Sequence, residues 1–424
     1  MELPIVEIEL TEPLPDLEAR CRAGGMALIV RHKQQVVGFL MLPATAKVQR
    51  DQLASLISAE AGTNIMAEKL RAELAQTPSP VPVPRLTVAI CTRDRPDLLA
   101  RCLGSLQHLP TAGNGGMRGF DVLVVDNAPS GDATRHATER QSDVTYTREV
   151  RPGLNFARNR ALQEARTEYI AYLDDDVVVD GGWLAGLQDA LTVHADAFAI
   201  TGQVLPLELA TRAQVLFERR GGFRHGFSRQ RYTGEYAGGG DLYPCRTGIF
   251  GVGCNMAFNR RRLLDLGGFD EALDTGPPLP GGGDHDIFYR VVRAGGPLVY
   301  EPRMLVFHQH RKTMPQLRHQ YWTWGLSVMA VATKWYREDP QMRTQWRWLI
   351  YRWFRMQIFD LLRSLAGRHV LPPGCIFREL AGGIVGLFGE YARSSRRSEA
   401  VSYTHLRAHE TQEVISYAVF CLKW

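Results

Sequence analysis

Three consecutive aspartates, Asp174, Asp175 and Asp176, follow a short apolar run in the stretch YLDDDVVVDGGW, residues 172–183. Like charges a few ångströms apart repel one another, so such a cluster is expected where a cation lies among the carboxylates or where solvent screens them. Hard cations such as Mg²⁺ and Mn²⁺ take one or two carboxylates together with substrate phosphates. The alternative is a solvated turn at an exposed strand end, whose last aspartate caps the following helix.

Two histidines further along the chain could complete such a cation site. The segment VFHQHRK, residues 306–312, places His308 and His310 two residues apart. On an extended segment, side chains two residues apart point the same way. A nitrogen ligand would favour Mn²⁺ over Mg²⁺. Which histidine would bind stays open, and two ordinary loop histidines are the alternative.

The elements that must position these residues form an alternating pattern after residue 85. Apolar runs predict strands, and amphipathic stretches predict helices between most of them. The alternation is typical of an α/β fold with a mostly parallel sheet covered by helices, in which ligands bind beyond the carboxyl ends of the strands. The predicted strands are 86–91, 120–125, 144–149, 169–173 and 197–204, and the clearest helices are 97–106, 156–168 and 182–194.

Polar residues gather where three of these strands end. They are CTRDRP at 91–96, DNAPSGD at 126–132 and the aspartate triplet, and we expect them to converge on one crevice. The first strand-to-helix turn is not GxGxxG, GVGCNM at 251–256 lacks the third glycine, and no Walker A loop is present. A dinucleotide cofactor is therefore not expected. A nucleotide held by carboxylates and a bound cation is the remaining interpretation.

Composition narrows the class of protein. The 424 residues contain 50 Lys and Arg against 45 Asp and Glu, a mild excess that does not imply nucleic acid as a partner. The seven cysteines are spread without a CxxC pair, so neither a disulfide framework nor a zinc knuckle is expected. No run of about 20 apolar residues suggests a spanning helix, and the acidic N-terminus is unlike a signal peptide. A cytoplasmic protein, soluble or peripheral at the membrane, is predicted.

The sequence outside the alternating pattern divides into four parts. Residues 1–75 predict a small α+β module of unknown role, with a helix from 51 to 75, and QTPSPVPVPR at 76–85 predicts an extended linker. The alternating domain would span 86–312, followed by a helical, aromatic and basic region at 313–398. Residues 399–424 are expected to be a partly non-native tail, because SYTHLRAHET resembles translated sequencing-adapter sequence.

A basic helix is predicted within the C-terminal region, in WRWLIYRWFRMQIFDLLRSL. At about 100° per residue, four arginines share an arc of about 160°. Such a face can lie on an anionic membrane, and it can equally pack against the domain of residues 86–312. We call these residues the arginine face: Arg347, Arg352, Arg355 and Arg363.

Seven segments together resemble the family 2 glycosyltransferases, which have the GT-A fold. The resemblance covers about residues 85–312 and rests on LTVAICTRDRPDLLARCLGSL, VLVVDNAPSGD, GLNFARNRAL, YIAYLDDDVVVDGGWL, GVGCNMAFNRRRLLDLGGFDEAL, GGGDHDIFYRVVRAG and VFHQHR. It implies transfer of a sugar from a nucleotide-diphosphate sugar, with inversion at the anomeric carbon, to a glycan, lipid-linked or small-molecule acceptor. LDDDV then corresponds to the DxD motif of the family.

The resemblance also implies roles for particular residues. Asp176 is the first choice as ligand of Mn²⁺ or Mg²⁺, with Asp174 and His308 as further ligands. Asp94 and Asp126 would recognise the nucleoside, although Asp94 could instead cap the following helix. The residues implied in binding the nucleotide-sugar are Thr92, Asp94, Asp126, Arg158, Asp174, Asp175 and Arg311.

Asp284 aligns with the catalytic base of the family. Family members commonly carry a glutamate directly before this aspartate, where Gly283 stands here, and Asp286 follows two residues later. The preceding TGPPLPGGG suggests that the base lies on a loop that orders over bound donor. A helix cap is the alternative role for Asp284, and Asp286 is the next candidate for the base.

Two other functions compete with glycosyl transfer. A sugar-phosphate nucleotidyltransferase would need a glycine-rich, basic loop after the first strand, where CTRDRPD stands. A nucleotide-sugar-binding protein without catalysis is the second alternative, and the presence of Asp284 argues against it.

Overall fold

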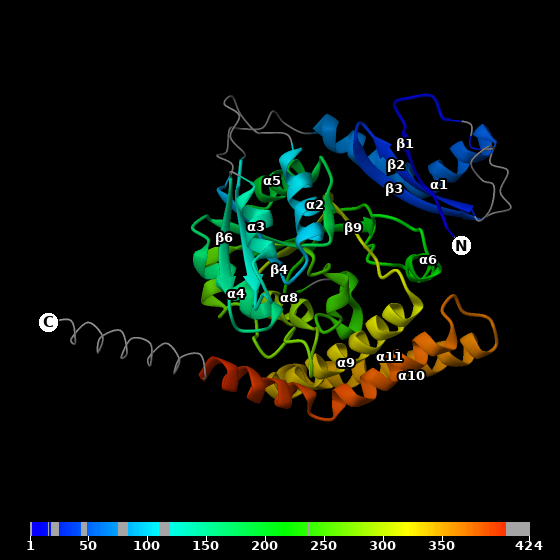
Figure 1. The fold of residues 1–424 in the computed structure, drawn as a ribbon. Helices are drawn as coiled ribbons and strands as arrows, with labels where there is room; N and C mark the ends of the chain where they lie inside the picture. The colour runs from blue at the N-terminus through cyan, green and yellow to red at the C-terminus, as the bar shows by residue number, and fades with distance from the viewer. Residues whose placement is uncertain are drawn as a thin grey trace.

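The computed structural model describes residues 2–15, 17, 25–43, 49–74, 84–109, 119–141, 143–235 and 237–403. Most of the predicted linker, from 76 to 83, and the tail beyond 403 lie outside these residues. Figure 1 shows a central α/β body with a small β-sheet unit on one side and a layer of long helices on another.

The central sheet is mixed, and its order among the described residues is β10-β12-β9-β11-β7-β4-β5-β6, with β8 paired to β12. The five predicted strands are confirmed as β4, β5, β6, β7 and β9. The bounds are β4 Leu86–Thr92, β5 Asp121–Asn127, β6 Val144–Glu149, β7 Tyr169–Asp174, β8 Val177–Val179, β9 Ala199–Pro206, β10 Gln230–Tyr232, β11 Asn255–Asn259 and β12 Leu298–His308.

The sheet differs from the expected mostly parallel one at one side. Strands β7, β4, β5 and β6 pair in parallel, as predicted. Beyond them β11 runs antiparallel between β7 and β9. Its five residues, NMAFN, are too short and too polar at both ends to show a strand period.

Helices cover both faces of the sheet because the central strands are apolar on both sides. In β4, Val88 and Ile90 pack towards α2 and α5, whereas Ala89 and Cys91 pack towards α4 and α8. Consecutive side chains of a strand point to opposite faces, so a continuous apolar run requires cover on each. The bounds are α2 Pro96–Gln107, α3 Ala133–Glu139, α4 Leu154–Glu164, α5 Trp183–Val193, α6 Arg212–Arg219, α7 Arg260–Asp265 and α8 Gly283–Arg293.

The N-terminal unit is a three-stranded sheet with one helix. It comprises β1 Ile5–Glu9, β2 Gly25–His32, β3 Gln35–Pro43 and α1 Arg50–Leu74. One face of this sheet packs on the central body, where Ile29 and Phe39 join Leu205 and Leu305 in one buried cluster. The unit is therefore held on the body by apolar contacts.

The C-terminal region consists of α9 Met314–Glu338, α10 Arg343–Leu365 and α11 Pro373–Leu387, followed by helical residues 390–403. Figure 1 shows these helices along one side of the central body. Helices α9 and α11 approach closely: a Cβ on Gly325 would lie 1.9 Å from the carbonyl oxygen of Glu379. Only glycine permits this backbone distance.

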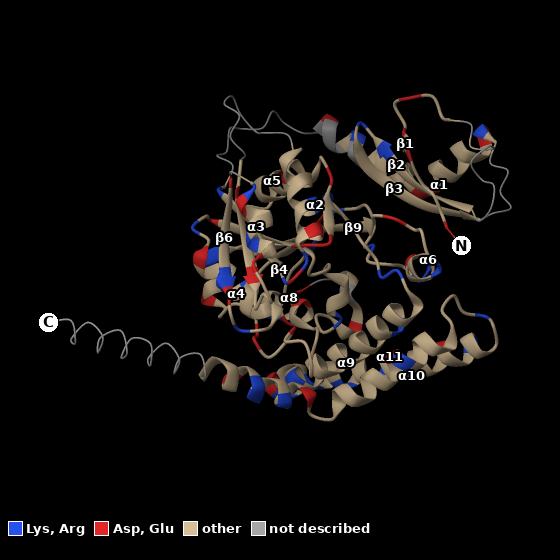
Figure 2. Cartoon of the chain, viewed as in Figure 1, with Lys and Arg blue, Asp and Glu red and all other residues tan. Residues whose placement is uncertain are grey.

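The four residues of the arginine face are exposed, and one of them, Arg352, also forms an ion pair of 3.3 Å with Asp241. Helix α10 buries its opposite side, which includes Trp346, Leu349 and Gln357. Figure 2 shows basic positions along the C-terminal helices among long stretches of uncharged residues. No helix in the described part of the chain combines the length and the apolar character needed to cross a membrane.

Candidate active site

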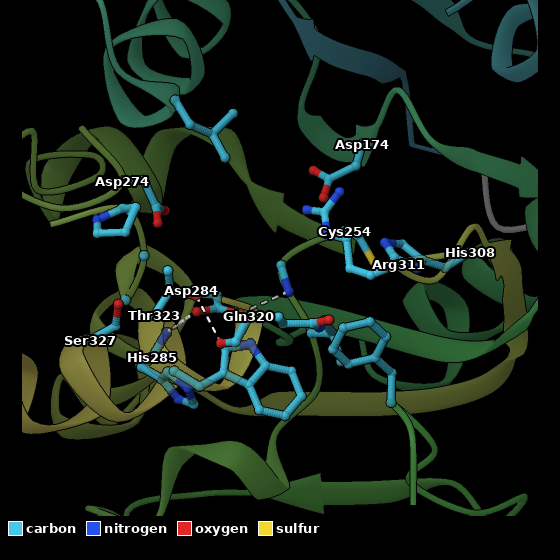
Figure 3. A pocket seen from close by; sticks show the side chains of 18 of the residues that line it. Asp174, Cys254, Asp274, Asp284, His285, His308, Arg311, Gln320, Thr323 and Ser327 are labelled. Atoms are coloured by element: carbon cyan, nitrogen blue, oxygen red, sulfur yellow. Dashed lines mark hydrogen bonds between the residues drawn. The ribbon is translucent and has the colours of Figure 1, made fainter. Parts of the chain in front are cut away.

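A cavity of about 540 Å³ lies at the carboxyl end of β7. Its walls come from β7, α4, the segments before β11 and α8, the end of β12, and one side of α9. Figure 3 shows Asp174, His308 and Arg311 in one part of the cavity, and Asp274, Asp284 and His285 in another. Side chains from β7, α8 and β12 therefore meet here, as the sequence predicts for Asp174, Asp284 and His308.

The three aspartates of the triplet differ in their surroundings. Asp174 lines the cavity with about a third of its side chain exposed (36%). Asp175 and Asp176 are buried, which differs from the expected exposed strand end. The chain continues from the triplet into β8, and the N-cap of α5 is Gly182, so Asp176 is not a helix cap. These two aspartates are buried because β8, which follows them, pairs with β12.

Asp175 points away from the cavity into a fixed hydrogen-bond arrangement. Its Oδ2 accepts a hydrogen bond of 2.6 Å from the Thr92 hydroxyl at the end of β4, and its Oδ1 accepts one of 3.2 Å from Arg95. These bonds tie the ends of β4 and β7 together. Thr92 therefore holds the triplet in place through Asp175.

Asp176 and His308 form a pair beside the cavity. The Asp176 Oδ1 atom is buried without a hydrogen-bond partner among the described residues, and it lies 3.4 Å from His308 Nε2. Burial is the main cause that lowers the pKa of His308 well below its usual range, and the charge of His310 is the second cause. The imidazole of His308 is therefore neutral and can offer a lone pair.

A chain of hydrogen bonds selects between the two histidines. His310 Nε2 lies 3.0 Å from the Glu218 carboxylate, and its Nδ1 lies 3.1 Å from His308 Nδ1. If His310 donates to Glu218, it accepts at Nδ1 from His308, which leaves the lone pair of His308 on Nε2, facing Asp176. Both ring nitrogens of His310 are then engaged. In this arrangement a free lone pair remains on His308 and not on His310.

The carboxylates of the triplet disfavour ionisation of one another. Loss of hydration inside the protein is the main cause that raises the pKa of Asp174 to about 7, and the negative charge of Asp176 is the second cause. Burial also raises the pKa of Asp176. A bound cation would reverse both effects by favouring the charged forms. Within the described residues, no group of three or more His, Cys, Asp and Glu side chains is arranged to hold a metal by itself.

Asp284 lies in the first turn of α8, not on a loop as expected. The helix begins at Gly283, directly after the glycine- and proline-rich segment. The Asp284 Oδ2 atom accepts a hydrogen bond of 3.2 Å from the backbone N–H of Gly253, and the carboxylate lines the cavity. A helical position with a backbone donor gives this acid a defined orientation.

Asp286 cannot serve as an alternative base. Its side chain is fully buried, and it accepts hydrogen bonds from Lys334 at 2.7 Å, Arg290 at 2.8 Å and the Trp335 indole at 2.9 Å. These partners use its lone pairs to connect α8 with α9. Its function is to hold the C-terminal helices on the central body.

Sequence reasoning missed Asp274, which occupies the space beside Gly283. A Cβ on Gly283 would lie only 2.3 Å from Asp274 Oδ2 and 2.5 Å from Asn155 Nδ2. Asp274 accepts a hydrogen bond of 3.0 Å from Arg158, and burial raises the pKa of Asp274 to about 6. An acid from a preceding loop therefore lies where a side chain at position 283 would go. No local pattern around residue 274 signals this placement.

Arg158 is 4% exposed and lines the cavity next to Asp274. Its guanidinium lies 3.0 Å from Asp274 and 4.0 Å from Asp174. Arg158 therefore does not lie on a solvated face of α4. Arg158 instead joins the two carboxylates from opposite parts of the cavity.

Asp94 and Asp126 lie at the same edge of the sheet but do not line this cavity. Asp94 is exposed, has a φ of 54°, and accepts hydrogen bonds of 2.9 Å from the backbone and hydroxyl of Ser130. It does not cap α2. Asp126 is buried, accepts a hydrogen bond of 2.9 Å from the Tyr146 hydroxyl, and has an Oδ1 without a partner among the described residues.

One side of α9 forms a wall of the cavity that sequence reasoning also missed. The lining residues on this helix are polar or aromatic and recur every three or four positions. That spacing, in a segment otherwise read only as aromatic and basic, is the signal that could have found them. They are Gln316, His319, Gln320, Thr323, Trp324 and Ser327.

Comparisons with known proteins find similarity to glycosyltransferases. Residues 87–261 match the family model described as Glycosyl transferase family 2. The pre-mycofactocin glycosyltransferase of Mycobacterium tuberculosis (strain CDC 1551 / Oshkosh) is 30% identical over 237 residues, which are 53% of this chain and 43% of that protein. Succinoglycan biosynthesis protein ExoM of Rhizobium meliloti (strain 1021) is 29% identical over 225 residues, 52% of this chain and 65% of ExoM.

The chain thus spans less than two thirds of the length of these relatives. Among solved structures, it is similar to the mannosyltransferase PcManGT from Pyrobaculum calidifontis in complex with GDP-Man and Mn²⁺, with 17% identity and a TM-score of 0.39 over 87% of this chain and 91% of that one. The family match therefore places a glycosyltransferase family 2 domain at residues 87–261, within the mixed α/β sheet.

Proposed function

We propose that the protein is an inverting glycosyltransferase that moves a sugar from a nucleotide-diphosphate sugar to a hydroxyl group in a single displacement. The acceptor hydroxyl gives its proton to Asp284 while its oxygen bonds to the anomeric carbon. The bond from that carbon to the phosphate oxygen breaks, and the electron pair leaves with the nucleoside diphosphate. Because attack and departure take place on opposite faces of the sugar, the configuration inverts.

The main support is the position of Asp284 across the cavity from Asp174. The two acids come from α8 and β7 and line the same cavity, and Figure 3 shows them at separate places on its wall. A donor whose diphosphate lies near Asp174 would place its sugar towards Asp284. Asp284 also remains available to accept a proton, whereas Asp286 is fully occupied by Lys334, Arg290 and Trp335.

The residues present fit a divalent cation bound together with the donor. Asp176 and His308 would be its protein ligands, with Asp174 close by, because the unpartnered Asp176 Oδ1 lies 3.4 Å from His308 Nε2. Two protein ligands suffice when phosphate oxygens complete the coordination. Mn²⁺ or Mg²⁺ in this place would offset the charge that develops on the diphosphate.

The remaining predicted residues would bind the nucleotide. Arg311 is exposed at the cavity and Arg158 lies beneath it, so both suit the diphosphate. Asp126, whose buried Oδ1 lacks a partner among the described residues, suits a donor group of the nucleoside. Asp94 lies at the same edge of the sheet, where it would border the nucleoside.

We also propose peripheral contact with an anionic membrane at its cytoplasmic side, where nucleotide-sugars are made. The outer surface of α10 combines the arginine face with exposed apolar side chains, among them Trp348, Phe359 and Leu362, which are 49%, 59% and 60% exposed. Basic and aromatic residues on one helix surface are typical of helices that lie in a membrane interface.

Hydrolysis of nucleotide-sugars by the purified protein tests the catalytic proposal, because water can replace the acceptor. Wild-type protein with Mn²⁺ should hydrolyse at least one donor of a panel, and nuclear magnetic resonance should first detect the sugar with inverted configuration. Asp284→Asn should keep donor binding but lower turnover about 100-fold or more, as expected for loss of a general base. Asp265→Asn, at an exposed position on α7, is the control. Full turnover in Asp284→Asn would contradict the assignment of the base.

A further inference from the structure

A second cavity, of about 390 Å³, lies next to the catalytic one. It is open to solvent on one side and is bordered by α10, α9 and the segment 242–248, and its walls are mainly apolar, including Val328, Leu349, Trp353 and Met356. We call it the α10 cavity. A concave pocket of this size with mainly apolar walls is suited to an apolar ligand group.

The α10 cavity adjoins the catalytic cavity through a single side chain. His285 lines both, and it directly follows Asp284 in α8. A hydrogen bond of 2.7 Å between His285 Nδ1 and the Thr247 hydroxyl fixes the ring between the two spaces. On α9, Ser327 lines the catalytic cavity and the next residue, Val328, lines the α10 cavity. A ligand in the α10 cavity would therefore reach the side of the base.

We propose that the α10 cavity binds the apolar part of the acceptor, so that the acceptor is an amphipathic alcohol whose hydroxyl reaches Asp284 past His285. This inference rests on the proposed function and specifies the class of acceptor. The catalytic cavity is lined largely by charged and polar side chains, which suit a sugar and a diphosphate. The apolar walls of the α10 cavity would contribute little to binding a free sugar, and they would bind an alkyl or aromatic group by excluding water from it.

Matched glycosides test the proposal without knowledge of the natural acceptor. Binding of n-octyl β-D-glucoside, below its micelle concentration, and of methyl β-D-glucoside is measured by calorimetry on the full chain. Each buried methylene strengthens binding about fourfold, so burial of only two or three of them should make the octyl glycoside roughly tenfold or more tighter. Equal affinities for the two glycosides would overturn the proposal.

Two variants locate the alkyl chain. Val328→Phe fills the cavity from α9, and Met356→Trp narrows it from a position that is 48% exposed, where a larger side chain leaves folding unaffected. Both should weaken octyl glucoside binding at least fivefold. Val193→Phe, at an exposed position at the end of α5, should not. Phe359→Ser tests the outer surface of α10: if this variant loses octyl binding and both cavity variants keep it, the chain binds outside and the proposal is wrong.

Donor hydrolysis separates this inference from the proposed function. The cavity variants should hydrolyse a nucleotide-sugar at the wild-type rate, because Val328 and Met356 do not line the catalytic cavity. If wild-type protein hydrolyses no donor, the proposed function fails. If it hydrolyses donor and yet does not prefer the octyl glycoside, only the acceptor class is wrong.

Discussion

Replacing Gly283 with alanine tests whether Asp274 belongs to the catalytic cavity. The backbone of Gly283 is helical, so an alanine meets no conformational penalty there. Its Cβ would lie 2.3 Å from Asp274 Oδ2, so the carboxylate must move and release Arg158. Separating one partner of a buried ion pair costs about 3–5 kcal/mol. We take the lower end, because Asp174 still lies 4.0 Å from the guanidinium.

The higher helix propensity of alanine offsets up to about 1 kcal/mol of the cost of separating this ion pair. Gly283→Ala should therefore lower the free energy of unfolding by about 2 kcal/mol. Calorimetry should then show a Tm lower by about 2–4 °C, accompanied by weaker donor binding. Gly104→Ala is the matched control: this glycine lies in α2, and an added Cβ there meets nothing within 4 Å. The control should be as stable as wild type or more so. A Gly283→Ala protein with unchanged Tm and donor affinity would refute the role assigned to Asp274.

Three further predictions concern the cation, the C-terminal helices and the membrane. Asp176→Asn should remove the gain in nucleoside-diphosphate affinity that Mn²⁺ produces in wild-type protein, and retention of that gain in calorimetry would exclude Asp176 as a ligand. Burial raises the pKa of half-buried Glu379 from 4.5 to about 7, so its ionisation should cost stability as the pH rises from 4.5 to 7. Glu379→Gln should therefore match wild type at pH 4.5 and be about 1–2 kcal/mol more stable at pH 8 in denaturant unfolding, whereas a difference at pH 4.5 alone would contradict this sign. Wild-type protein should sediment with anionic but not neutral vesicles, and binding should fall with salt and with glutamine at Arg347, Arg352 and Arg355; no binding at low salt would refute the membrane contact.

The sheet and the polar residues at its edge could be predicted because they depend on local patterns. Apolar runs of five to eight residues identified β4 to β7 and β9, and the position of the aspartates directly after such a run placed them at a strand end. The resemblance to a family pattern also assigned Asp284 and His308 to the same site. Both residues line the cavity at the end of β7. Short β11 escaped prediction because five residues with polar ends do not establish a period.

Only the tertiary structure determines which acidic residues line the cavity and which are held by other side chains. The triplet predicts a site, but Thr92 and Arg95 turn Asp175 away, and β12 brings His308 to Asp176. Asp274 enters the cavity because Gly283 leaves space for it. Local periodicity determines whether a segment forms a strand or a helix. The orientation and charge of a buried side chain depend on partners that are distant in sequence, and only the folded chain brings those partners together.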